Sequence, residues 1–292
     1  MKKETLQKQT KLANNIMYYI YTHIETHIDI EELSYDLNIS KFHMHRVFKA
    51  IFGKNIYEMI KSIRLQKDAN LLLTNNTSTI SNIANLCGYS SQSSFIKAFK
   101  ERFDVSPKQW RQGDYKSYSH KILQQSQKAM QSRADFSKLK PTIVKMPDLQ
   151  SFYIRNKGYN TNIKETWQKL YTWVLNNNIE NYTQIALLHD NPTITPLNEC
   201  QYIACIVVEE ETLTLEHNRL PNFKISNGVY AKFDFQGKHG DMLRFIHWVY
   251  HEWLIQSEYE TTTKPSYVIY HKNNFLSDDN TFDVSFFISI NF

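Results

Sequence analysis

The chain has 292 residues, of which 41% are hydrophobic and 14% aromatic, with only 7 Gly and 7 Pro. This composition excludes disorder and collagen-like or proline-rich architectures for most of the length, and at roughly 100–200 residues per domain the length predicts two domains. The three cysteines form no CxxC pair and no stretch reaches ~18 uninterrupted apolar residues, so we expect a cytoplasmic protein with no zinc site, signal peptide, membrane span or cofactor.

The formal net charge of +5 is unevenly distributed along the chain. Residues 1–113 contain 16 Lys and Arg against 10 Asp and Glu, whereas residues 114–292 contain 18 against 19. A basic excess confined to the first part favours a polyanionic partner for that part. A surplus of this size also occurs in proteins that bind no nucleic acid, so the charge needs a motif beside it.

The first third of the sequence is predicted to be helical over residues 12–112. Apolar side chains at i, i+3, i+4 and i+7 predict a first helix over residues 10–26. A second helix begins at Asp29, whose side chain suits an N-cap, and ends at Asn38, which tolerates a left-handed turn. Ser40 then caps a third helix. Two short helices joined by such a turn form a helix-turn-helix.

The same pattern returns about fifty residues later. Thr79 or Ser81 begins a short helix, and Gly88 supplies the turn. Ser90 or Ser91 caps the helix that follows. Five pairs of residues keep a constant offset of 51: Met44 and Phe95, Arg46 and Lys97, Phe48 and Phe99, Lys49 and Lys100, Phe52 and Phe103. The repeat predicts a second helix-turn-helix unit.

A longer helix is predicted between the two copies, over residues 56–74. At ~1.5 Å per residue its length is about 28 Å, which approaches the ~34 Å between successive major-groove faces of a DNA duplex. Residues 1–113 are therefore expected to form an all-α domain in which two helix-turn-helix units are joined by a helix.

Three segments of this domain match a family signature: SKFHMHRVFK at 40–49, IANLCGYSSQSSFIKAFK at 83–100 and FDVSPKQWR at 103–111. The block resembles the DNA-binding domain of the AraC/XylS family of bacterial transcription regulators, especially the small multidrug and stress-response activators. The resemblance implies a transcription regulator, more often an activator, that binds double-stranded DNA and contacts RNA polymerase.

The resemblance also indicates which residues read the DNA bases. In the first recognition helix these correspond to Phe42, His45 and Arg46, and Arg46 can donate two hydrogen bonds to a guanine. Phe42 and His45 stand where related proteins have Trp and Gln. The second helix contributes Gln92, Ser93, Ser94, Ile96 and Lys97. Since Ile96 can only sense shape or a thymine methyl group, we expect the second half-site to be read loosely. Phe48, Phe95, Phe99 and Trp110 are assigned to the core.

The remainder of the chain predicts a second domain of different class. Residues 114–140 are mostly polar and are interpreted as a partly helical linker, and Pro141 begins a domain over 141–292. Helices are predicted over 161–174 and 240–255, and strands over 142–155, 184–189, 201–208, 228–235, 266–271 and 282–290. Gly158 and Gly237 precede the two helices, 79 residues apart.

This order predicts an α+β domain of two β-α-β-β units, with an antiparallel sheet and both helices on one face. The seam between the units is a natural pocket. Six segments, RNKGY at 155–159, WQKL at 167–170, HDNP at 189–192, CQYIAC at 200–205, SNGVYA at 226–231 and WVYHEWL at 248–254, are similar to gyrase-inhibitor-like effector-binding domains. The resemblance implies a cleft for bulky apolar molecules, which are often cations.

One position departs from that family. Members that bind cations, and relatives that hydrolyse small molecules, place a buried glutamate where this chain has Val268. A valine offers no charge to a cation, which disfavours both a cationic effector and catalysis. We expect an aromatic cleft for a bulky apolar effector, formed by Tyr159, Trp167, Tyr230, Trp248 and Tyr270. The alternative is that these aromatic residues are core.

Two other functions remain open at this point. One is a small-molecule hydrolase with a fused DNA-binding module, and the other is a regulator whose second domain binds a protein. His247 and His251 have the i, i+4 spacing of a helical metal site, with His239 nearby, but the adjacent tryptophans favour a packed helix without metal.

Overall fold

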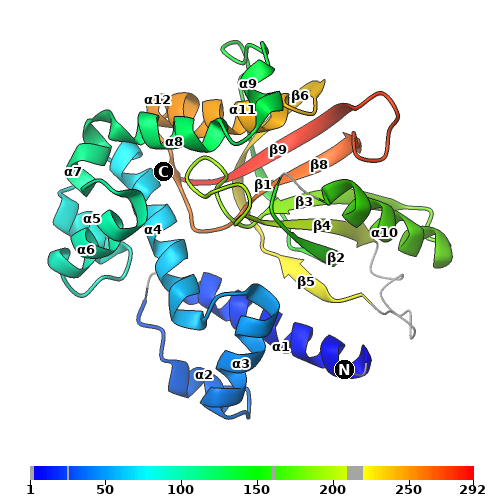
Figure 1. The fold of residues 1–292 in the computed structure, drawn as a ribbon, viewed down its shortest axis with the longest axis horizontal. Coiled ribbons are helices and arrows are strands. Elements are labelled where there is room, and N and C mark those ends of the chain that lie inside the picture. Colours follow the sequence, from blue (N-terminus) through cyan, green and yellow to red (C-terminus); the bar gives the residue numbers. More distant parts are fainter. Residues whose placement is uncertain (1–2, 25, 160–161, 209–219) are drawn as a thin grey trace. The chain divides into compact units, whose positions relative to one another are not determined.

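A computed structural model describes residues 3–24, 26–159, 162–208 and 220–292 (Figure 1). The chain divides into two compact units, residues 1–113 and residues 114–292.

The first unit is built of helices, as the sequence predicts. They are α1 (Lys3–His23), α2 (Ile30–Asp36), α3 (Lys41–Phe52), α4 (Ile56–Thr74), α5 (Ile80–Leu86), α6 (Gln92–Phe103) and α7 (Pro107–Gln109), followed by the π-helical turn η1 (Trp110–Asp114). The first helix begins seven residues before the expected residue 10, because polar residues that do not extend the apolar stripe still form helix.

Local capping defines both helix-turn-helix units. The Asp29 carboxylate accepts hydrogen bonds from the main-chain N–H groups of Glu31 and Glu32, and the Ser40 hydroxyl accepts one from His43. Thr79 and Ser91 cap α5 and α6 in the same way. The turns contain left-handed residues, Asn38 with φ 52° and Gly88 with φ 78°.

Buried apolar side chains lie beneath both helix-turn-helix units. The residues assigned to the core from sequence, Phe48, Phe95, Phe99 and Trp110, are fully buried. The indole of Trp110 packs against Phe99 and donates a hydrogen bond of 3.0 Å to the Ala69 carbonyl, which ties the end of the unit to α4.

The second unit begins with two short helices, α8 (Tyr115–Leu123) and α9 (Gln127–Gln131), in the segment interpreted as a linker. Its strands are β1 (Thr142–Met146), β2 (Leu149–Lys157), β3 (Tyr182–Leu188), β4 (Gln201–Val208), β5 (Asn222–Ile225), β6 (Gly228–Lys238), β7 (Glu260–Thr261), β8 (Ser266–Lys272) and β9 (Thr281–Asn291). Its helices are α10 (Ile163–Asn176) and the continuous run α11 (Asp241–Trp248), η3 (Val249–Trp253) and α12 (Leu254–Gln256).

The strands form one antiparallel sheet in the order β1-β6-β9-β8-β3-β4-β2-β5, with β7 paired to β9. The two repeats are β2-α10-β3-β4 and β6-α11-β8-β9, and they meet where β3 pairs with β8. Each repeat is preceded by a strand that pairs with the other repeat, since β1 lies beside β6 and β5 beside β2. The halves are therefore joined by exchanged strands as well as by their seam.

Both long helices pack on the same face of the sheet, α10 over β2 and β4 and α11 over β6. The large core on that face includes Trp167, Phe233 and Phe245. A second buried cluster, with Tyr153, Tyr230 and Tyr267, lies on the alternate residues of the strands. Among the described residues, no helix is long and apolar enough to cross a membrane.

Candidate functional site

The first recognition helix, α3, presents a solvent-facing surface near its N-terminus. Phe42 is 77% exposed, and Arg46 is also exposed. A guanidinium nitrogen of Arg46 donates to Nδ1 of His43 at 3.1 Å, which holds the side chain along the helix. His45 differs from its neighbours because its ring stacks on Tyr57, and burial together with Lys41 lowers its pKa.

The second recognition helix, α6, presents a mainly uncharged surface. Gln92, Ser93, Ser94 and Lys97 are exposed, and Ile96 is half-buried. The hydroxyl of Ser94 donates to the main-chain carbonyl of Ser91 at 2.8 Å. That hydroxyl is therefore engaged in the capping turn, and Lys97 carries the exposed positive charge among these five residues.

One side chain connects the two helix-turn-helix units, and sequence analysis did not single it out. Arg64 of α4 donates to the carbonyls of Ile24 at 3.1 Å and Thr26 at 2.8 Å, both ahead of α2. It also donates to the Gly88 carbonyl at 3.0 Å, in the turn of the second unit. A Cβ atom at position 88 would lie 2.8 Å from the guanidinium, so a side chain there would displace Arg64, and the positive φ of 78° favours glycine independently. The only signal in the sequence was a charged residue within an apolar stripe.

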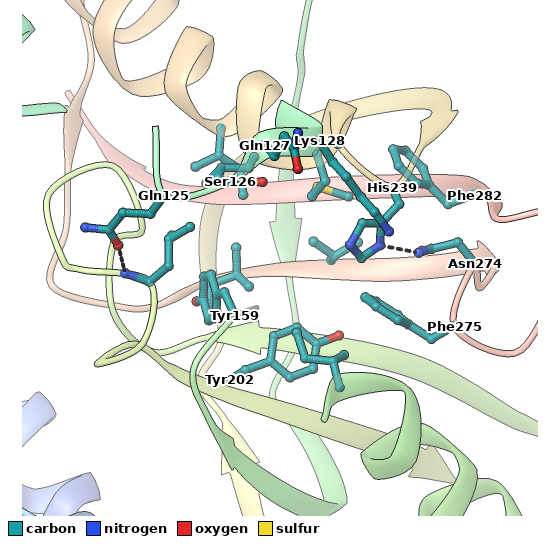
Figure 2. A pocket seen from close by; sticks show the side chains of 18 of the residues that line it. Gln125, Ser126, Gln127, Lys128, Tyr159, Tyr202, His239, Asn274, Phe275 and Phe282 are labelled. Atoms are coloured by element: carbon teal, nitrogen blue, oxygen red, sulfur yellow. Dashed lines mark hydrogen bonds between the residues drawn. The ribbon is translucent and has the colours of Figure 1, made fainter. Parts of the chain in front are cut away.

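The second unit contains a cavity of about 340 Å³ at the seam between the repeats, on the face covered by helices (Figure 2). Its floor is formed by β3, β4, β8 and β9, and its sides by α10 and α11. The wall is largely apolar and aromatic, with Ile163, Leu188, Leu197, Tyr202, Met242, Leu243, Ile246, Phe275 and Phe282. A concave apolar site with a few polar groups is the usual form of a small-molecule site.

The end of the loop after α8 and the first turn of α9 contribute the remaining wall. Gln125, Ser126, Gln127 and Lys128 all line the cavity. The Gln125 side chain accepts a hydrogen bond of 2.9 Å from the Leu197 N–H. At Gly240 a Cβ atom would collide with the main-chain carbonyl of Lys128, so glycine lets α9 approach the start of α11.

Of the five aromatic residues predicted to form the cleft, the structure brings two to the cavity, Tyr159 and Tyr270. Trp167 lies directly behind the wall, where its indole donates to the Tyr202 hydroxyl at 2.8 Å and its ring meets Tyr270 edge to face. Its role is to position two lining tyrosines.

The other two do not reach the cavity. Tyr230 lies on the opposite face of the sheet, packed on Tyr267, because Phe233 of the same strand takes the helix-covered face and side chains alternate. Trp248 packs against Phe136 and Phe233 at the far end of α11. For these two residues the structure agrees with the alternative that they are core.

Val268 lines the cavity and is 1% exposed. The position where cation-binding relatives keep a glutamate therefore faces the ligand space, as the resemblance implied. Among the described residues that line the cavity none is Asp or Glu.

The three histidines separate into two environments. His239 lines the cavity, whereas His251 lies near Thr193 and Ser119 at 3.0 and 3.3 Å and His247 is adjacent to it. Burial, then a second histidine, lowers the pKa of His247 to about 3, and burial, then Lys116, lowers that of His251 to about 4. In the part of the chain that is described, no three His, Cys, Asp or Glu side chains gather to hold a metal.

Comparison with known proteins matches both units. The profile of a GyrI-like small molecule binding domain matches residues 139–290, and that of a helix-turn-helix domain matches residues 33–113. The chain is similar to the xylose operon regulatory protein of Escherichia coli K12, with 34% identity over 95 residues, which are 32% of this chain and 24% of that protein. It thus spans about a quarter of that relative.

Two further similarities also cover about a third of this chain. The HTH-type transcriptional activator AarP of Providencia stuartii is 30% identical over 108 residues, 37% of this chain and 79% of that protein. Among solved structures, the C-terminal domain of AraT, a response regulator from Geobacillus stearothermophilus, aligns with 30% identity and a TM-score of 0.33, covering 35% of this chain and 84% of that one.

Proposed function

This chain belongs to the AraC-type helix-turn-helix proteins that carry a GyrI-like small molecule binding domain, and from that premise we propose that it is a bacterial one-component transcription regulator acting in the cytoplasm. The first unit binds two adjacent major-groove segments of double-stranded DNA through α3 and α6. The second unit binds a bulky apolar effector in the seam cavity.

The observation that carries DNA binding is the pair of capped, solvent-facing recognition helices on a unit with a basic excess. Arg46 is exposed on α3, and Lys97 is exposed at the equivalent position of α6. A guanidinium can read a guanine by two hydrogen bonds, while nearby lysines neutralise phosphates. One chain thus holds two recognition helices, and specific binding requires no second copy.

The salt dependence of DNA affinity tests this proposal. We expect log K against log salt to fall linearly, with a slope of about −0.9 for each phosphate contact. Fluorescence anisotropy with sites recovered by genome-wide mapping would provide the measurement. An affinity that does not change with salt, or a full-length protein that retains it after Arg46 and Lys97 are both replaced by Ala, would contradict the assignment.

We further propose that the protein activates transcription through contact with RNA polymerase, and that it is not an enzyme. The name of the AarP relative supports the first statement. The lining supports the second, because Val268 occupies the position at which hydrolytic relatives keep their glutamate and the described lining residues include no carboxylate.

A thermal-shift screen with neutral, anionic and cationic apolar compounds tests the effector role. Because a ligand that binds only the folded state raises the unfolding midpoint, we expect stabilisation by a subset of these compounds. If none stabilises the protein, the second unit is better explained as a surface for a protein partner.

A further inference from the structure

The seam cavity combines an apolar floor with a lysine and a histidine at one wall. Of the described lining residues, Lys128 and His239 are those that can carry positive charge, and none is acidic. Figure 2 shows Lys128 and His239 at the same wall, with the ring of Phe275 next to His239. Burial lowers the pKa of His239, and the nearby charge of Lys128 lowers it further.

The hydrogen bonding of His239 fixes which ring nitrogen carries the proton. The side-chain amide nitrogen of Asn274 lies 3.3 Å from Nδ1 of His239. An amide NH₂ can only donate, so Nδ1 accepts and the neutral ring has its proton on Nε2. The ring is also held edge to face against Phe275, with centroids 5.5 Å apart. His239 is thus a fixed N–H donor even when uncharged.

Resting on the proposed effector role of the cavity, we propose that the effector is an aromatic or other flat apolar carboxylate. Its anionic group sits between Lys128 and the Nε2–H of His239. Its apolar body lies over Val268 and against the rings of Tyr202 and Phe275. The volume of about 340 Å³ is at the small end of ligand sites, which suits one or two fused rings.

A cationic or a neutral ligand would fit the wall formed by Lys128 and His239 less well than an anion. A cation would face Lys128 with no carboxylate to offset the loss of its hydration. A neutral ligand would fill the apolar part without using either donor. An anion satisfies both donors by charge-assisted hydrogen bonds.

Lys128 lies outside the part of the chain that matches the GyrI-like profile. It precedes residues 139–290, which match the GyrI-like profile, and lies on α9. The apolar cavity is formed largely by residues of the matched domain, whereas the charge that selects an anion comes from the helical segment of the second unit that precedes it.

Three probes of nearly equal shape test the proposal on the full-length protein by isothermal titration calorimetry: 2-naphthoate, 2-naphthalenemethanol and 2-naphthylmethylammonium. We expect 2-naphthoate to bind about tenfold more tightly than the alcohol, which corresponds to one charge-assisted contact, and the ammonium to bind weakest. Lys128→Met should reduce naphthoate affinity to that of the alcohol while the alcohol is unaffected. Lys121→Met, an exposed lysine outside the cavity, is the matched control and should change neither.

The outcomes separate this proposal from the effector role itself. Equal affinity for naphthoate and the alcohol, or an equal loss of both in Lys128→Met, would overturn the assignment of an anion but leave an apolar effector site. Failure of all three probes to bind at millimolar concentration would overturn the anion site and the proposed use of the cavity together.

Discussion

Replacing Arg64 with Met should loosen the connection between the two helix-turn-helix units. The side chain donates to three main-chain carbonyls, one of them in the turn of the second unit and two in the segment before α2. Methionine keeps much of the apolar stem but provides no donor. The carbonyls of Ile24 and Gly88 are then left partly buried without this partner.

The magnitude follows from the exposure of each bond. Hydrogen bonds to charged groups contribute about 1.5–3 kcal/mol each, and water can replace the bond to the exposed Thr26 carbonyl, so two bonds are counted. Because Arg64 itself is half-buried, we take the lower end and expect the free energy of unfolding to fall by about 3 kcal/mol. Affinity for the full DNA site should fall more than affinity for random DNA, since only the full site requires both recognition helices in register.

Hydrogen–deuterium exchange of the full-length protein provides the assay, with faster exchange expected in α2 and α5 together. Lys61→Met is the control, because Lys61 lies on the same helix and makes one exposed ion pair with Glu101 at 2.7 Å, which solvent screens. Arg64→Lys keeps the charge but cannot span both sets of carbonyls, so it should resemble Arg64→Met. Wild-type exchange and DNA affinity in Arg64→Met would refute the reasoning.

Three other changes test the two sites. Arg46→Ala should weaken the free energy of binding to the specific DNA site by about 1–3 kcal/mol and relax the base preference at one or two base pairs, as measured by binding to a library of sites. An equal loss of affinity for random DNA would show that Arg46 touches only phosphate. Val268→Glu should lower the free energy of unfolding by about 3 kcal/mol through an unpaired buried charge, which a thermal-shift assay can follow. It should also raise the affinity for 2-naphthylmethylammonium in calorimetry, and unchanged cation binding would place the carboxylate outside the ligand space. Affinity for 2-naphthoate should rise as pH is lowered from about 8 to 6, by at most about tenfold per unit, because a bound anion raises the pKa of His239, which burial and then the Lys128 charge lower in the free protein. His239→Gln should remove this dependence.

The features that sequence predicts best are those set within a few residues. Asp29, Ser40 and Ser91 cap helices because each hydroxyl or carboxylate meets an N–H two or three positions later. The 51-residue repeat and the order of strands and helices are likewise visible in local patterns. The two-residue β7 and four-residue β5 are too short to produce such a pattern, and their pairing partners are distant in sequence.

The cavity was harder to predict because its residues converge over long sequence distances. On β6 the apolar residues Ala231, Phe233 and Phe235 alternate with a set that contains Tyr230, Lys232 and Asp234, so the period-2 pattern of the strand places Tyr230 on the face opposite Phe233 and away from the cavity. Lys128 reaches the cavity because α9 approaches Gly240 closely, and no pattern in the polar segment 114–140 predicts that approach. Val268 could be placed in advance because the family resemblance marked that position.

The wall supplied by residues 125–128 has a thermodynamic consequence for regulation. This stretch follows α8, which begins directly after the end of the first unit, so a group that contacts the ligand is covalently continuous with the DNA-binding unit over about one helix. If occupancy of the cavity changes DNA affinity by some factor, DNA must change effector affinity by the same factor. The specific operator would then act as an effector of the cavity, and adding it to the protein should shift the naphthoate titration in the same direction and to the same extent.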